Sequence, residues 1–175
     1  YLVFGNEKTF LRENNMLVEF KTSNYRSFKN EQDFSMQTGK RLTKYKKSNT
    51  ITMGNEKLLK SSLLFGANAN GKTNLLTALL MFKNLILHPT TDEIQKLRTD
   101  SFGYNKKNTT FEITFIKNKN EYNYALEYNS KEIVNEVLIS NKKTVFSRNR
   151  QKVEHIPNQL VQLTANVRKN QLLLY

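Results

Sequence analysis

The 175-residue sequence contains no cysteine and no tryptophan, and it has only two prolines, six glycines and two histidines. The absence of cysteine excludes disulfide scaffolds, thiolate metal sites and cysteine nucleophiles. His88 and His155 lie far apart in the sequence, which disfavours a histidine-based metal cage. No apolar run approaches the roughly 18 residues of a bilayer-spanning helix. We therefore expect no membrane partner and a cytoplasmic location.

Positive charge is in excess. The chain has 28 lysines and arginines against 15 aspartates and glutamates, a formal net charge of +13, and this favours contact with polyanions such as DNA, RNA or nucleotides. Two places concentrate it: a basic run over residues 40–47, and Arg148, Arg150 and Lys152 alternating along a predicted strand. Each of these two basic segments either binds a phosphate backbone or is a solvated surface, and we favour the solvated surface.

Hydrophobic patterning predicts one α/β domain. A four-residue apolar run at 62–65 stops at Gly66, as a buried parallel strand does, and residues 72–87 have a helical apolar face that ends before Pro89. Residues 37–50 are polar and predict a loop. Two strands precede this loop, at 17–21 and 33–36. Alternation predicts five antiparallel strands after the helix, at 111–115, 122–128, 133–139, 144–147 and 151–155. We expect Tyr122, Tyr124 and Tyr128 to pack within the sheet rather than to stack bases.

One motif carries chemistry. Gly66-Ala67-Asn68-Ala69-Asn70-Gly71-Lys72-Thr73 matches G-x-x-x-x-G-K-[ST], the phosphate-binding P-loop. Gly66 allows a sharp turn off the strand, and Gly71 allows close approach of backbone to phosphate. Backbone N–H groups from about 69 to 73 form an anion cradle at a helix N-terminus. The Lys72 ammonium can reach the β- and γ-phosphates, and the Thr73 hydroxyl is a candidate Mg²⁺ ligand.

The P-loop and its flanks carry a family resemblance. The string GANANGKTNLL over residues 66–76 resembles the RecF/SMC-like branch of ABC-type ATPases, in which asparagine is common at the position of Asn68. Upstream, Asn24-Tyr25-Arg26-Ser27-Phe28 between two strands is similar to the segment that opens these head domains. Residues 111–148 resemble their antiparallel β-subdomain. The sequence also resembles prokaryotic ATPases of abortive-infection and phage-defence systems, akin to the ATPase half of overcoming-lysogenisation-defect nucleases.

This resemblance implies an ABC-head type P-loop NTPase with ATP and Mg²⁺ as cofactors. It implies head-to-head homodimers in the intact protein, with DNA and a nuclease as further partners. Lys72 and Thr73 would be catalytic, with Thr73 on the metal. The nucleotide would be bound by Gly66, Asn68, Ala69, Asn70, Gly71, Lys72, Thr73 and Asn74, together with Arg26 and Ser27. The segment 25–28 is also open to a simpler interpretation, a turn with a solvated Arg26.

Several parts of an ABC-type ATPase are missing from the sequence. No Walker B carboxylate follows an apolar strand, since the aspartates are Asp33, Asp92 and Asp100, and no signature motif or switch histidine is visible. We therefore expect residues 16–175 to be the N-terminal part of a longer ATPase, inactive alone. Leu172, Leu173 and Leu174 would then be uncovered where a C-terminal lobe docks. Residues 1–15 are either upstream sequence or an ordinary N-terminal arm of the protein. Three glutamines are equal candidates for the glutamine loop of the family: Gln159, Gln162 and Gln171.

Two other functions stay open at this point. A non-enzymatic nucleic-acid-binding module would use the P-loop only as an anion site, and the net charge of +13 favours it. A P-loop kinase would need an acceptor site and a lid, and the sequence indicates neither.

Overall fold

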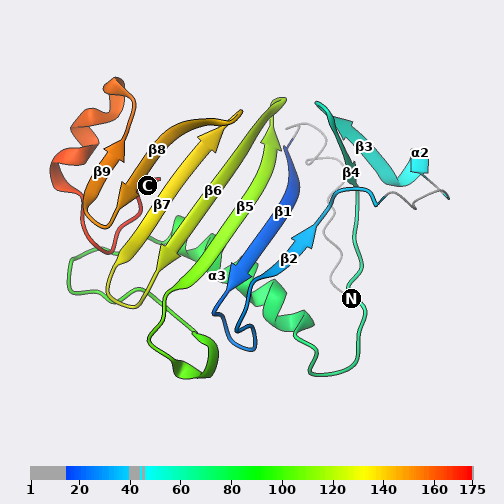
Figure 1. The fold of residues 1–175 in the computed structure, drawn as a ribbon, viewed down its shortest axis with the longest axis horizontal. Coiled ribbons are helices and arrows are strands. Elements are labelled where there is room, and N and C mark those ends of the chain that lie inside the picture. Colours follow the sequence, from blue (N-terminus) through cyan, green and yellow to red (C-terminus); the bar gives the residue numbers. More distant parts are fainter. Residues whose placement is uncertain (1–14, 40–43, 45, 175) are drawn as a thin grey trace.

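The computed structural model describes residues 15–39, 44 and 46–174. Its main element is a seven-stranded sheet with the order β2-β1-β5-β6-β7-β8-β9 (Figure 1). The strands are β1 (Asn15–Ser23), β2 (Gln32–Ser35), β5 (Thr109–Lys117), β6 (Asn120–Tyr128), β7 (Ile133–Ser140), β8 (Lys143–Asn149) and β9 (Lys152–His155). The two strands predicted before the P-loop and the five antiparallel strands predicted after the helix are confirmed, and all seven pair antiparallel. The two strands before the P-loop join the same sheet as the five after it.

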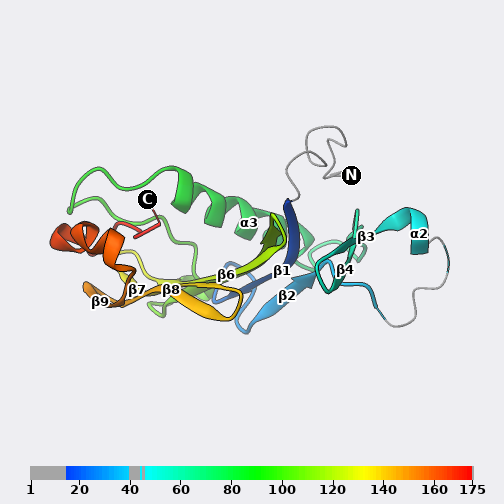
Figure 2. The same cartoon turned by 90° about the horizontal axis from the view of Figure 1, so that it is seen from above.

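Helix α3 (Lys72–Leu87) packs across one face of this sheet (Figure 2). The bounds predicted for it, 72–87, and its buried apolar face are confirmed. Ala78 and Met81 lie in the core, whereas Leu80 is 52% exposed. The helix contacts a layer of aromatic rings from the sheet, and the centroid of Phe82 lies 5.5 Å from that of Phe111. The helix is thereby fixed against the strands, and its N-terminus lies at a defined place beside the sheet.

A second hairpin was missed by the sequence analysis. Strands β3 (Thr50–Met53) and β4 (Glu56–Leu59) pair across Gly54-Asn55, after the short helix α2 (Lys46–Asn49). The predicted loop at 37–50 is therefore wrong over its last residues. The hairpin covers a smaller core of Met16, Val18, Met53, Leu58 and Ile116. The signal was present, because a two-residue turn with glycine between short apolar runs is typical of hairpins.

The predicted parallel strand at 62–65 is wrong. Residues 61–67 have no regular structure, and Leu63 and Phe65 are 61% and 81% exposed. A parallel strand needs a parallel neighbour to complete its hydrogen bonds. Every strand pairing in the described part of the chain is antiparallel, so this segment has no such partner there. The fold is α/β, with an antiparallel sheet instead of the expected parallel element.

Arg148 is buried rather than solvated. Its side chain and that of Glu136 are both fully buried, with 2.8 Å between Arg148 Nε and Glu136 Oε2. The Nε–H is not well aligned for a hydrogen bond, so the contact is mainly ionic. Arg148 Nη2 donates to the carbonyl of Gln171, and the amide of Leu173 donates to Glu136. Arg148 was predicted to lie on the surface because the sequence does not reveal that Glu136 lies opposite it in the sheet.

The segment that follows is held by this pair. The 3₁₀ helix η2 (Asn158–Asn166) leads into it, and Leu172 is buried, which corrects the expectation that it would be uncovered. Leu174 is 41% exposed. Tyr124 and Tyr128 are buried in the sheet, as predicted, and Tyr122 stacks on Phe115.

Other predictions lie partly outside the described residues. That is so for most of the 1–15 segment and for residues 40–43 and 45 of the basic run. His88 and His155 are exposed. Among the described helices, none has the length and apolar character to cross a membrane.

Candidate functional site

The P-loop leads directly into the N-terminus of α3. Gly71 is the N-cap, with a left-handed φ of 80°, and no side chain caps the helix. The first backbone bond of the helix runs from the Leu75 amide to the Gly71 carbonyl. The N–H groups of residues 71–74 therefore have no intrahelical acceptor. Four amides at the positive end of a 16-residue helix are therefore available as donors to an anion.

Lys72 bends back over the loop that precedes it. Its Nζ donates to the carbonyls of Gly66 and Ala67, at 2.7 Å each. Ala69, between these carbonyls and the helix, has a left-handed φ of 66°. The ammonium therefore lies within the P-loop and holds its two ends together. A phosphate group entering the loop would meet this charge as well as the free amides.

The β1–β2 loop packs against the P-loop at Gly71. A Cβ built on Gly71 would lie 2.7 Å from Phe28 Cε1 and 3.5 Å from Ser27 Oγ. Asn74 Nδ2 donates to Ser27 Oγ at 2.7 Å. Glycine is thus required at position 71 for two reasons, its left-handed φ and the approach of Phe28. The contact brings Ser27 to the first turn of α3, beside the P-loop.

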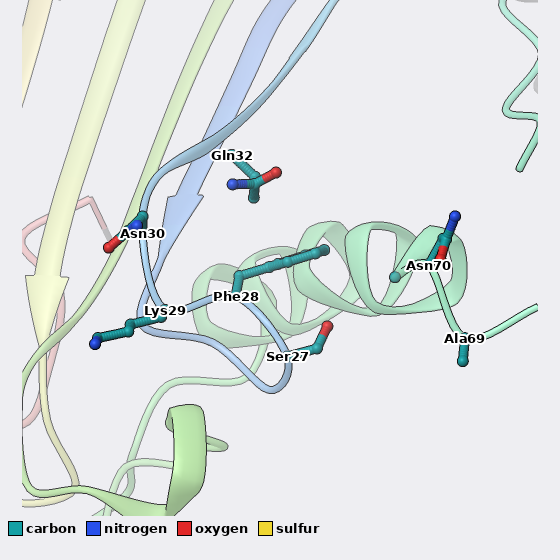
Figure 3. Close-up of a pocket in the computed structure, with 8 residues that line it drawn as sticks. Ser27, Phe28, Lys29, Asn30, Gln32, Ala69 and Asn70 are labelled. Atoms are coloured by element: carbon teal, nitrogen blue, oxygen red, sulfur yellow. The ribbon is translucent and has the colours of Figure 1, made fainter. Parts of the chain in front are cut away.

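A cavity of about 330 Å³ lies between these two loops. Figure 3 shows Ser27 and Phe28 reaching from the β1–β2 loop toward α3, with Ala69 and Asn70 at the helix end. The lining residues are Ser27, Phe28, Lys29, Asn30, Gln32, Ala69, Asn70 and Gly71. None of these is acidic, and Lys29 adds a positive charge. The cavity suits an anionic ligand.

Arg26 lies apart from this cavity. Its Nε donates to Asp100 Oδ2 at 2.6 Å and its Nη1 to Thr77 Oγ1 at 3.4 Å. The hydrogen bond to Asp100 raises the pKa of the Arg26 guanidinium. The Thr77 hydroxyl in turn donates to the Thr73 carbonyl. Arg26 therefore contacts α3 one turn beyond Thr73, while its neighbour Ser27 contacts the first turn.

The structure brings most of the predicted site residues together. Gly66 and Lys72 meet through a hydrogen bond, and Ala69, Asn70 and Gly71 line one cavity with Ser27. Asn74 joins them through Ser27, and the Asn68 and Thr73 side chains are exposed beside the loop. Sequence reasoning missed Phe28 and Lys29 as lining residues. It also missed Asp100 as the partner of Arg26, since only the fold brings residues 74 positions apart into contact.

A comparison with protein families identifies the same region. The family described as AAA domain, putative AbiEii toxin, Type IV TA system matches residues 61–155, which is more than half of the 175 residues. The chain belongs to this AAA-domain family. The match includes the P-loop, helix α3 and strands β5 to β9. No curated protein matches the chain.

Membership of the AAA-domain family supports a P-loop ATPase related to abortive-infection proteins. Within the described residues, no group of three or more histidine, cysteine, aspartate or glutamate side chains could hold a metal ion.

Proposed function

We propose that this protein binds MgATP at the P-loop and, when intact, hydrolyses it as an ABC-head type ATPase. The turnover would be coupled to DNA-related work such as phage defence or the gating of a nuclease. One observation carries the proposal: the motif over residues 66–73 lies at the uncapped N-terminus of α3, with the Lys72 ammonium inside the loop. Membership of the AAA-domain family supports the nucleotide-binding and ATPase part of the proposal.

The residues present fit a nucleoside triphosphate. Free amides of residues 71–74 and the Lys72 charge meet the phosphate oxygens, and the exposed Thr73 hydroxyl is available to Mg²⁺. Bound Mg²⁺ would neutralise charge on the β- and γ-phosphates. The Lys72 side chain would exchange its carbonyl acceptors, Gly66 and Ala67, for phosphate oxygens. That exchange replaces neutral acceptors by charged ones and so strengthens the hydrogen bonds.

Hydrolysis needs a group that the described site does not supply. A carboxylate normally positions the attacking water, and none lines the P-loop cavity. We infer that this carboxylate and a signature motif come from other parts of the intact protein, in a head-to-head homodimer. Loss of one such stabilising group typically lowers the rate by about 10²–10³. Residues 16–175 alone should therefore turn ATP over far more slowly than about 1 s⁻¹.

The proposal is tested by measuring the ATP affinity of a variant that lacks the P-loop lysine. Lys72→Ala should weaken binding of a fluorescent ATP analogue strongly, because it removes the charge inside the P-loop. Lys83→Ala is the matched control, since Lys83 is exposed on the same helix α3 and contacts no part of the loop. Equal affinity of the two variants would remove the P-loop assignment.

The alternative is a non-enzymatic nucleic-acid-binding module. The net charge of +13 favours it, as do the exposed Arg150 and Lys152, although Arg148 is buried and cannot contribute. Such a module would bind duplex DNA without ATP, and Lys72→Ala would weaken this binding because it removes the charge of the anion site. DNA affinity that rises when MgATP is added supports the ATPase instead.

A further inference from the structure

A second cavity lies on the side of α3 where Arg26 points. It has a volume of about 330 Å³ and is lined by Arg26, Asp100, Ser101, Gly103 and Tyr104. Tyr104 is 93% exposed, which is unusual for a large aromatic side chain. It also has a left-handed φ of 53°, a conformation that bulky residues rarely adopt. An exposed aromatic ring that forms one wall of a cavity is available to stack on a planar ligand.

The loop that carries Tyr104 is held rigidly. The side chain of Asn24, at the end of β1, donates to the carbonyls of Lys107 and Asn108 and bonds reciprocally with the Asn105 side chain. Ser101 Oγ donates to the Asn105 carbonyl at 2.7 Å. The Tyr104 ring is therefore presented on an ordered loop. A ligand that stacks on it would lose little affinity to the ordering of that loop.

The floor of the cavity is a charged pair with unused hydrogen-bonding capacity. Arg26 is tied to Asp100 twice, by its Nε and by its backbone amide, which donates to the Asp100 carbonyl at 2.7 Å. Asp100 Oδ1 accepts no hydrogen bond within the described part of the chain. It is a single free acceptor beside an exposed aromatic ring. This combination suits a planar heterocycle that carries one amino group, such as adenine.

The cavity is close to the P-loop. Arg26 contacts Thr77, and the Thr77 hydroxyl bonds to the Thr73 carbonyl. Four residues of α-helix rise about 6 Å, so this wall of the cavity is one turn from the phosphate-binding amides. This separation is short enough for a nucleotide with its phosphates at the N-terminus of α3 to extend its base to the cavity.

We propose that the cavity formed by Arg26, Asp100, Ser101, Gly103 and Tyr104 holds the adenine ring of the nucleotide bound at the P-loop. The ring stacks on Tyr104, and its exocyclic amino group donates to Asp100 Oδ1. Arg26 positions the Asp100 carboxylate. This inference rests on the proposed MgATP binding and adds the part of the site that selects the base.

The first experiment separates the base from the phosphates. Binding of ATP and of inorganic tripolyphosphate, each with Mg²⁺, is measured by calorimetry on the full chain. Tyr104→Ala should weaken ATP binding roughly 5- to 100-fold, the usual range for a lost base–aromatic stack, and should leave tripolyphosphate binding unchanged. Tyr104→Phe keeps the ring and should stay within about twofold of the wild type for both ligands.

The outcomes distinguish this inference from the proposed function. If Lys72→Ala weakens binding of both ligands while Tyr104→Ala weakens binding of neither, the P-loop assignment is supported and the base-cavity assignment is wrong. If Tyr104→Ala weakens both ligands equally, the loop acts through the fold and the cavity assignment is also wrong. If Lys72→Ala changes neither, the proposed function itself fails. A Tyr104→Ala defect seen with a single-stranded oligonucleotide but not with ATP assigns the cavity to nucleic acid and overturns the inference.

A second experiment tests Asp100. ITP carries a carbonyl oxygen where ATP carries the amino group, so it presents an acceptor to the Asp100 carboxylate. The wild type should prefer ATP over ITP. Asp100→Asn, whose amide can donate to that carbonyl and can still accept from Arg26, should lose or reverse the preference. An unchanged ATP-to-ITP ratio in Asp100→Asn would refute the role of Asp100.

Discussion

The buried pair of Glu136 and Arg148 offers the sharpest test of how the sheet is held to the segment that follows it. Glu136 accepts hydrogen bonds from the Tyr124 hydroxyl and from the amides of Leu173 and Leu174, in addition to its ion pair with Arg148. In Glu136→Ala these donors lose their acceptor, and the Arg148 charge stays buried without a counterion. Breaking a buried pair from one side costs about 3–5 kcal/mol. With a urea m-value of about 2 kcal/mol/M, the unfolding midpoint should fall by about 2 M.

The exposed pair of Glu132 and Arg150 is the matched control. Its side chains are 29% and 59% exposed and lie 3.3 Å apart, and such surface pairs contribute about 0–1 kcal/mol. Urea unfolding followed by circular dichroism should show a much smaller midpoint shift for Glu132→Ala than for Glu136→Ala. A double variant, Glu136→Leu with Arg148→Met, removes both charges and should recover part of the loss. Equal shifts for the two single variants would show that the buried pair does not stabilise the fold as reasoned here.

Three further predictions follow from single sites. Gly71→Ala should destabilise the protein more than Gly54→Ala and should also weaken ATP binding. Both glycines have left-handed φ, but only a Cβ at position 71 would collide with Phe28. Equal melting temperatures of the two variants would contradict this prediction. Stability should fall as the pH rises above 10, because burial and the nearby Glu136 raise the pKa of Tyr124, so the folded state keeps a proton that the unfolded state releases. Tyr124→Phe should make that fall shallower in pH-dependent urea titrations, and an unchanged slope would refute the assignment. Arg26→Ala should weaken ATP binding less than Lys72→Ala does, and it should lower the melting temperature because the ion pair with Asp100 is lost. Normal ATP affinity together with a lower melting temperature would show that Arg26 has only a structural role.

Local patterns predicted most of the elements. The helix over 72–87 and the strands of the sheet are encoded by side-chain periodicity within short windows, which is why their positions could be predicted. The P-loop is likewise contiguous, so its residues are found together in space because they are together in the chain. The longest of these features, helix α3, spans 16 residues.

Features that depend on distant partners could not be predicted. The alternation of Arg148, Arg150 and Lys152 suggested one charged face, but strand register places Arg148 opposite Glu136. A bulge between Leu138 and Ile139 shifts that register, and nothing in the local sequence fixes it. The prediction of a strand at 62–65 was wrong for a similar reason, since four apolar residues before a glycine do not reveal whether a parallel partner strand lies beside them.

The β1–β2 loop links the sheet to both candidate cavities. Asn24 and Arg26 have left-handed φ values of 50° and 49°, and these two bends direct successive side chains to different places. Arg26 turns toward Asp100 and Thr77, whereas Ser27 turns toward Asn74 and Gly71. Because β1 pairs with β5 along most of its length, the loop is anchored to the sheet. The N-terminus of α3 is therefore held on two sides by adjacent residues of one short loop, so a shift of that loop would change the phosphate and base cavities together.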